Sequence, residues 1–188
     1  MTLSENHGYS DPSARLLAEL TRYHFKKSPI PFNVFYQGLE DHILRELDSY
    51  LAFESTIFPP YITIDTCEHS LCFAFAIGVK IMRRFAREKS LIVRGKLLDT
   101  VVKIQIFCPV SSPEMRLLFE NEREIFEYLA SIARFETLLE CAKEETVLTF
   151  TIPLYNEKTF QVYTPNSEDY TQLFKEVLHY ISEKYGEK

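Results

Sequence analysis

The sequence predicts an α+β fold, a two-layer sandwich in which helices cover one face of a mixed β-sheet. Residues 100–108 and 146–153 alternate apolar and polar side chains, as half-buried strands do. Several other stretches carry apolar residues at helical spacing. One of them, residues 68–87, is apolar on nearly every side in its middle, which indicates a central buried helix. The predicted order is helix, helix, strand, helix, two strands, helix, two or three strands, helix.

The N-terminal part predicts two helices. Asp11 can cap a first helix with Pro12 in its first turn, and helical spacing continues to about residue 27. Residues 28–31 contain two prolines, which force their predecessors out of the α region and end this helix. Asn33 can cap a second helix, whose apolar stripe runs on to Leu51.

The middle of the chain predicts a strand, the central helix and a strand pair. Residues 61–64 form a short extended segment, after which Asp65 or Thr66 can cap the central helix. Two strands follow at 90–94 and 100–108, joined by a turn around Gly95.

The C-terminal part predicts a long fourth helix, further strands and a last helix. The fourth helix covers residues 114–134, and strands follow at 137–141 and 146–153. Residues 160–163 can extend the sheet, and Ser167 can cap the last helix. Glutamates along the fourth helix are expected on its solvated face: Glu120, Glu122, Glu124 and Glu127.

Composition narrows the function classes. The net charge of −6 and the pI near 5.4 argue against nucleic acid and against anionic membranes as partners, since both favour basic surfaces. No apolar run approaches the ~20 residues that span a bilayer, so we expect a cytoplasmic protein. The cysteines form no CxxC pair and are expected to be free thiols: Cys67, Cys72, Cys108 and Cys141.

Several segments resemble the ATP-binding domain of sensor histidine kinases, a member of the superfamily that includes gyrase-type and chaperone ATPases. Residues 16–22 resemble the end of the kinases' second dimerisation helix, and residues 31–35 resemble the start of their ATPase domain. Residues 61–65 are similar to the strand and aspartate before the central helix. Residues 107–114 fall where the family has its Asp-x-Gly-x-Gly loop, and residues 148–154 resemble its final strand.

The resemblance implies a division into three parts. Residues 1–30 would be an N-terminal tail and dimerisation-type helix, and residues 31–165 the ATPase-like sandwich domain. Residues 166–188 would be a C-terminal helix.

The residues that bind ATP in that family are missing from this sequence. Active members hold magnesium and phosphates with an asparagine and a nearby acid on the central helix, but residues 71–87 contain no Asn, Asp, Glu or Gln. Cys108 stands in place of the loop aspartate that binds adenine, and no glycine occurs between Gly95 and Gly186 to let backbone approach phosphates. The phosphate lid is also missing, since Phe119 leads almost directly into the next helix.

Histidines offer little chemistry. His42 follows two acidic residues but lacks the rest of a phosphoacceptor box, and His24 has no flanking signature. No histidine has metal-ligand spacing with cysteines or acids. We therefore predict no catalytic, cofactor-binding or metal-binding residue, and we do not expect ATP to be a ligand.

Three functions remain open. The favoured one is a noncatalytic signalling or regulatory protein, a pseudo-ATPase of bacterial two-component type, that acts through a protein partner or as a homodimer. If its first helix dimerises, Leu16→Asp with Leu20→Asp should give monomers. The alternative is a phosphotransferase using His42 or His24, or a weak nucleotide-binding enzyme. The second alternative is a small-ligand sensor whose vacated nucleotide pocket is lined by apolar residues: Phe75, Val79 and Cys108.

Overall fold

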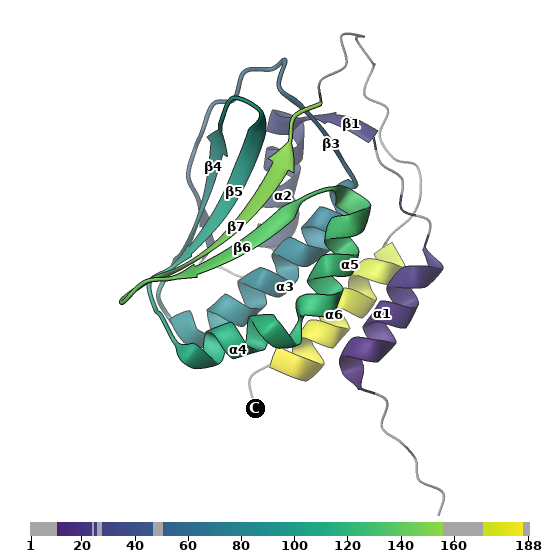
Figure 1. Cartoon of the computed structure of the whole chain (residues 1–188), viewed down its shortest axis with the longest axis vertical. Coiled ribbons are helices and arrows are strands. Elements are labelled where there is room, and N and C mark those ends of the chain that lie inside the picture. Colours follow the sequence, from purple (N-terminus) through teal and green to yellow (C-terminus); the bar gives the residue numbers. More distant parts are fainter. Residues whose placement is uncertain (1–10, 24, 26–27, 47–50, 156–170, 186–188) are drawn as a thin grey trace, which may run out of the picture.

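The computed structural model describes residues 11–23, 25, 28–46, 51–155 and 171–185 (Figure 1). The helices in these residues are α1 (Pro12–Arg22), α2 (Phe32–Glu46), α3 (Glu68–Ala86), α4 (Pro113–Asn121), α5 (Arg123–Ala133) and α6 (Thr171–Tyr185). The strands are β1 (Ser28–Pro31), β2 (Leu51–Phe53), β3 (Thr63–Thr66), β4 (Leu91–Leu97), β5 (Val101–Cys108), β6 (Glu136–Cys141) and β7 (Thr146–Pro153). No helix in this described part of the chain combines the length and the hydropathy that crossing a membrane requires.

The main sheet of the described residues has five strands in the order β2-β4-β5-β7-β6. The strand β2 runs parallel to β4, and the other pairs are antiparallel, so the sheet is mixed. The strands β1 and β3 form a separate antiparallel pair, which an isolated bridge between Ile64 and Leu154 joins to the end of β7. This arrangement confirms the predicted α+β fold class.

The predicted alternation of β5 is confirmed. Val102, Ile104 and Ile106 are fully buried, whereas the residues between them are half-buried on the other face. Ile104 pairs with Phe150 of β7, which is also fully buried. One face of the sheet therefore forms the floor of the hydrophobic core.

Helix α3 is the central buried helix that the sequence predicts. It lies across the sheet, and 12 of its 19 residues are buried (Figure 1). At Gly78 the helix approaches β7 so closely that an added Cβ would lie 2.5 Å from Cδ2 of Leu148. A residue without a side chain therefore sets the spacing between helix and sheet at this position.

Helices α6 and α1 lie beyond α3, on the side away from the sheet (Figure 1). Helix α6 packs against α3, and α1 packs against α6. Leu16 and Leu20 of α1 are buried and belong to the same hydrophobic core as Val177 and Ile181 of α6. The stripe that was expected to dimerise is thus covered within this chain, and the division into three parts remains a prediction.

Some predicted boundaries were wrong. Helix α1 ends at Arg22 rather than near residue 27, and Leu51 belongs to β2 rather than to the second helix. Gly95 lies inside β4, and the turn follows it, where the amide of Leu98 donates to the carbonyl of Val101 at 2.9 Å. The edge strand β2 has only three residues, which explains why it has no clear alternation in sequence.

The predicted caps of the central helix were also wrong. Its N-cap is Cys67, whose side chain makes no capping bond, while the hydroxyl of Thr66 donates to the carbonyl of Ala133 at 2.7 Å. Helix α2 begins at Phe32, one residue before Asn33. The predicted strand at 160–163 and the Ser167 cap lie outside the described residues.

The predicted fourth helix is two helices. Helix α4 ends at Asn121 and α5 begins at Arg123, with Glu122 between them at φ −93° and ψ 3°. The amide of Glu122 donates to the carbonyls of Leu118 and Phe119, both at 3.2 Å, which tightens the last turn of α4. The break turns the Glu122 side chain away from solvent.

Candidate functional site

The segment expected to correspond to the kinases' glycine loop is a short connection between β5 and α4. Four residues separate Cys108 from Pro113, and the hydroxyl of Ser112 accepts a bond from the amide of Glu114 at 3.2 Å. Ser112 is therefore the N-cap of α4, with Pro113 at the first helical position. The connection starts a helix directly, and only Glu122 separates that helix from α5.

The residues expected to line a vacated nucleotide pocket are in the core instead. Phe75, Val79 and Cys108 are fully buried. The ring of Phe75 lies 6.2 Å from that of Phe53 and 5.9 Å from that of Phe150, measured between centroids. The Cys108 thiol donates to a carbonyl of α3 at 3.8 Å, and burial raises its pKa. The expectation that these three side chains border an open pocket is wrong.

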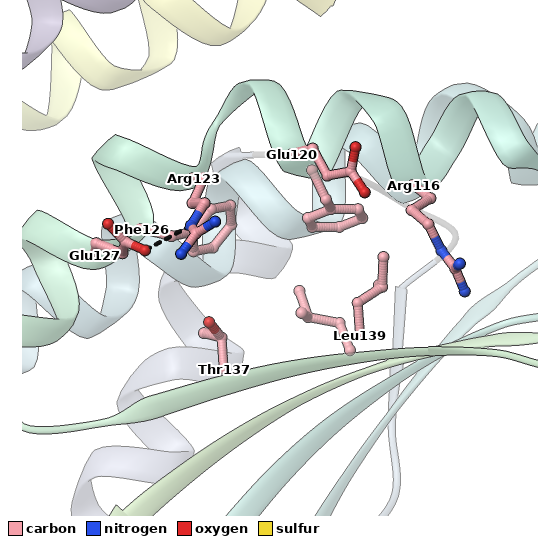
Figure 2. A pocket seen from close by; sticks show the side chains of 9 residues that line it. Arg116, Glu120, Arg123, Phe126, Glu127, Thr137 and Leu139 are labelled. Atoms are coloured by element: carbon pink, nitrogen blue, oxygen red, sulfur yellow. Dashed lines mark hydrogen bonds and ion pairs between the residues drawn. The ribbon is translucent and has the colours of Figure 1, made fainter.

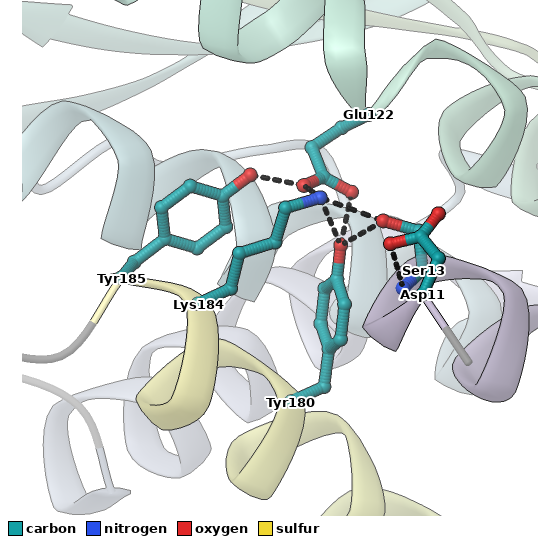
Figure 3. A network of polar contacts seen from close by, with 6 residues as sticks. All are labelled: Asp11, Ser13, Glu122, Tyr180, Lys184 and Tyr185. Carbon is teal, nitrogen blue, oxygen red and sulfur yellow. Dashed lines mark hydrogen bonds and ion pairs between the residues drawn. The ribbon is translucent and has the colours of Figure 1, made fainter. Parts of the chain in front are cut away.

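A buried polar cluster joins the α4–α5 break to α6 and α1 (Figure 3). Glu122 is 0% exposed, and its carboxylate accepts a bond from the Tyr180 hydroxyl at 2.5 Å and another from the Tyr185 hydroxyl. The Lys184 ammonium lies 2.5 Å from Oε1 of Glu122 and donates to the Ser13 hydroxyl at 2.6 Å. We call these five residues the Glu122 cluster.

The electrostatics of the Glu122 cluster are those of a closed structural site. Burial raises the pKa of both Tyr180 and Tyr185, and their hydrogen bonds to the Glu122 carboxylate raise it further. Both tyrosines therefore remain protonated donors at neutral pH. A buried carboxylate needs such compensation, and here it comes from α6, with α1 attached through Ser13. The expectation that Glu122 is solvated was wrong.

A separate cavity of about 530 Å³ opens between helices α4 and α5 and the β6 edge of the sheet (Figure 2). Its floor is apolar and its rim is polar, with two arginines and two glutamates. The floor consists of Phe119, Phe126, Leu139 and Leu148, and the rim of Arg116, Glu120, Arg123, Glu127 and Thr137. The Arg123 guanidinium and the Glu127 carboxylate form an ion pair at 2.6 Å, so the rim is balanced in charge.

The described residues do not bring a histidine into the Glu122 cluster or into the lining of this cavity. His42 lies in α2, and His24 lies outside the described residues. His69 is in the first turn of α3, and His179 is exposed on α6. Among the described residues, no three His, Cys, Asp or Glu side chains lie close enough together to hold a metal ion. The four cysteines are free, and Cys67 and Cys108 are buried.

Sequence reasoning did not find the Glu122 cluster or the cavity. The only signal for the cluster is that Tyr180 and Lys184 are four residues apart and therefore share one face of α6. Nothing in the sequence marked the cavity, because its lining comes from four elements that only the fold brings together.

Solved structures resemble the fold. The histidine kinase AdeS of Acinetobacter baumannii superposes with a TM-score of 0.57 at 12% identity, over 77% of this chain and 76% of that one. The ATP-binding domain of PrrB from Mycobacterium tuberculosis gives a TM-score of 0.54 at 14% identity, over 69% of this chain and 98% of that one. The histidine kinase domain of the E. coli osmosensor EnvZ gives a TM-score of 0.55 at 12% identity, over 77% of this chain and 99% of that one. No protein-family model and no curated protein matches the sequence. The chain therefore has the fold of a histidine-kinase-type ATPase domain.

Proposed function

We propose that this chain is a noncatalytic signalling or regulatory protein, in which a histidine-kinase-like ATPase fold has lost its nucleotide site and acts by binding another protein. The observation that carries the proposal is the composition of α3. From Leu71 onward the central helix has no Asn, Asp, Glu or Gln, and magnesium requires oxygen ligands. Without them this part of the helix cannot hold a metal–phosphate complex through its side chains.

The connections around α4 support the same proposal. Phosphates bind where glycines let backbone amides approach them, and the four residues between β5 and α4 are Pro109, Val110, Ser111 and Ser112. A mobile lid requires length, and the break between α4 and α5 is a single residue that is fully buried. These connections favour a rigid surface over a closing nucleotide pocket.

Helix α6 gives further support. It packs against α3 on the side away from the sheet, and the Glu122 cluster links it to the α4–α5 break through hydrogen bonds and an ion pair. Ser70 of α3 donates to a carbonyl of α5 at 2.8 Å and is fully buried. The helices α3, α5 and α6 therefore form one packed unit. Such a unit is suited to a scaffold that presents its surface to a partner protein.

Phosphate transfer tests the proposal. The full chain is incubated with γ-³²P-labelled ATP and magnesium, and protein-bound label is measured after quenching at alkaline pH, where phosphohistidine survives. We expect no incorporation above that of heat-denatured protein. Label that disappears in His42→Ala or in His24→Ala would contradict the proposal and establish the phosphotransferase alternative.

A further inference from the structure

Within the part of the chain that the structure describes, the strand β6 is an open edge of the main sheet. It pairs with β7 on one side, and no other strand of the described residues pairs with it. An unpaired edge presents a row of backbone donors and acceptors to solvent, which can pair with a strand from another chain.

The hairpin between β6 and β7 identifies the residues whose backbone groups face outward. Ala142 and Glu145 close the turn, with the Ala142 amide donating to the Glu145 carbonyl at 2.8 Å. Hydrogen-bonded and non-hydrogen-bonded pairs alternate in an antiparallel ladder. From the register of β6 and β7, the amides and carbonyls of Thr137, Leu139 and Cys141 point to the open edge.

The same edge borders the cavity. Leu139 pairs with Leu148 and Thr137 pairs with Phe150, so both side chains face the helical layer. Figure 2 shows Thr137 and Leu139 rising from the sheet toward α4 and α5, with Phe126 above Thr137. An added strand would place alternate side chains beside Thr137 and Leu139, at the mouth of the 530 Å³ cavity with its apolar floor.

The side chains on the other face of β6 indicate the charge of the partner segment. Glu136, Leu138 and Glu140 point away from the helices, and Leu138 is 57% exposed between two exposed glutamates. A second copy that paired antiparallel about Leu138 would place Glu136 opposite Glu140. Like charges directly opposite each other are destabilising, whereas a basic residue opposite each glutamate is favourable.

We infer that β6 is a docking edge for an extended, basic segment of a partner protein, which adds a strand to the sheet. The segment has basic residues opposite Glu136 and Glu140 and apolar residues at the two positions that enter the cavity. The balanced rim ion pair of Arg123 and Glu127 lies on the helical side, away from those basic residues. This inference deepens the proposed function by naming the surface and the chemistry of the partner.

A designed peptide tests the docking edge. The probe is a fluorescein-labelled peptide with the core lysine–isoleucine–threonine–isoleucine–lysine, titrated with the full chain to about 1 mM, the range of weak contacts. A second probe carries glutamate in place of both lysines. The variant Glu136→Lys/Glu140→Lys reverses the charge of the edge. Its control is Glu88→Lys/Asp99→Lys, which makes the same change in net charge at exposed residues outside β6.

We expect the lysine probe to bind saturably and the reversed edge to bind it at least about fivefold more weakly, while preferring the glutamate probe. The control variant should retain the original preference. On binding, hydrogen exchange at the amides of Thr137 and Leu139 should slow. No saturable binding, or equal weakening in both variants, would overturn the inference. Phosphate transfer is a separate readout, so failure of the docking edge leaves the proposed function standing, and the reverse also holds.

Discussion

Replacing Lys184 by methionine would remove the cation that compensates a buried carboxylate. Glu122 is 0% exposed, and the Lys184 ammonium lies 2.5 Å from its Oε1, with 23% of the Lys184 side chain exposed. Methionine keeps much of the stem volume and removes the charge. Lys184→Met also removes the donor to the Ser13 hydroxyl, which anchors α1 at 2.6 Å.

The expected loss follows from the geometry. Breaking a buried ion pair by removing one partner costs about 3–5 kcal/mol. Tyr180 and Tyr185 still donate to the Glu122 carboxylate, and Lys184 is partly solvated, so we expect the lower end, about 3 kcal/mol. That is a large fraction of the roughly 5–15 kcal/mol by which a domain is stable.

Urea unfolding at pH 7, followed by far-UV circular dichroism, measures this loss. The control is Arg15→Met, which breaks an exposed pair between α1 and α6, where Arg15 meets Glu183 at 2.8 Å, and should cost less than about 1 kcal/mol. The double variant Glu122→Gln/Lys184→Met should recover part of the stability, because no charge remains buried. A Lys184→Met protein within about 1 kcal/mol of wild type would refute the account of the Glu122 cluster.

Two further predictions concern packing and pH. Gly95→Ala should destabilise the fold by about 1–3 kcal/mol in the same assay, because the new Cβ would lie 2.5 Å from Cζ of Phe58; an unchanged midpoint would contradict this. Burial raises the pKa of Tyr36 to about 12 from an unfolded value near 10. The contribution of the protonated Tyr36 hydroxyl to the free energy of unfolding is therefore complete below pH 10. It is lost as the pH rises to 12, which lowers the free energy of unfolding by about 2–3 kcal/mol. Urea midpoints from pH 9 to 12 should fall less steeply in Tyr36→Phe, and equal slopes would contradict the assignment.

The parts of the fold that sequence could predict are those in which burial acts along a single element. The strand β5 alternates because one of its faces meets the core, and α3 is apolar on nearly all sides because it is covered on nearly all sides. Such patterns involve residues that are close together in the sequence, so the strand, the helix and the fold class could be predicted from them.

Glu122 shows why the rest could not be predicted. Helix-forming residues surround it, and a glutamate in such a run normally faces solvent. Its burial depends on Tyr180, Lys184 and Tyr185, which lie about sixty positions later in the sequence. The break in the helix is thus a tertiary effect, because the local sequence favours continuing it.

The candidate surfaces depend on the same kind of information. The open edge at β6 can be recognised only from the strand order, and the cavity only from the fold that brings α4, α5, β6 and β7 together. The composition of α3 from Leu71 onward, in contrast, can be read directly from the sequence, because a carboxylate or amide side chain that is absent from a segment is absent in any fold. This is why the sequence alone could favour a noncatalytic protein but could not name a surface.

Calorimetric titration of the full chain with ATP and magnesium tests the central claim most directly. The protein concentration must allow millimolar affinity to be detected, and cooperative urea unfolding of the same sample establishes that it is folded. We predict no heat beyond dilution, because α3 from Leu71 onward has no carboxylate or amide side chain to bind magnesium and the connection after β5 has no glycine. Saturable binding of one ATP per chain would contradict the claim and show that the nucleotide site persists on other residues.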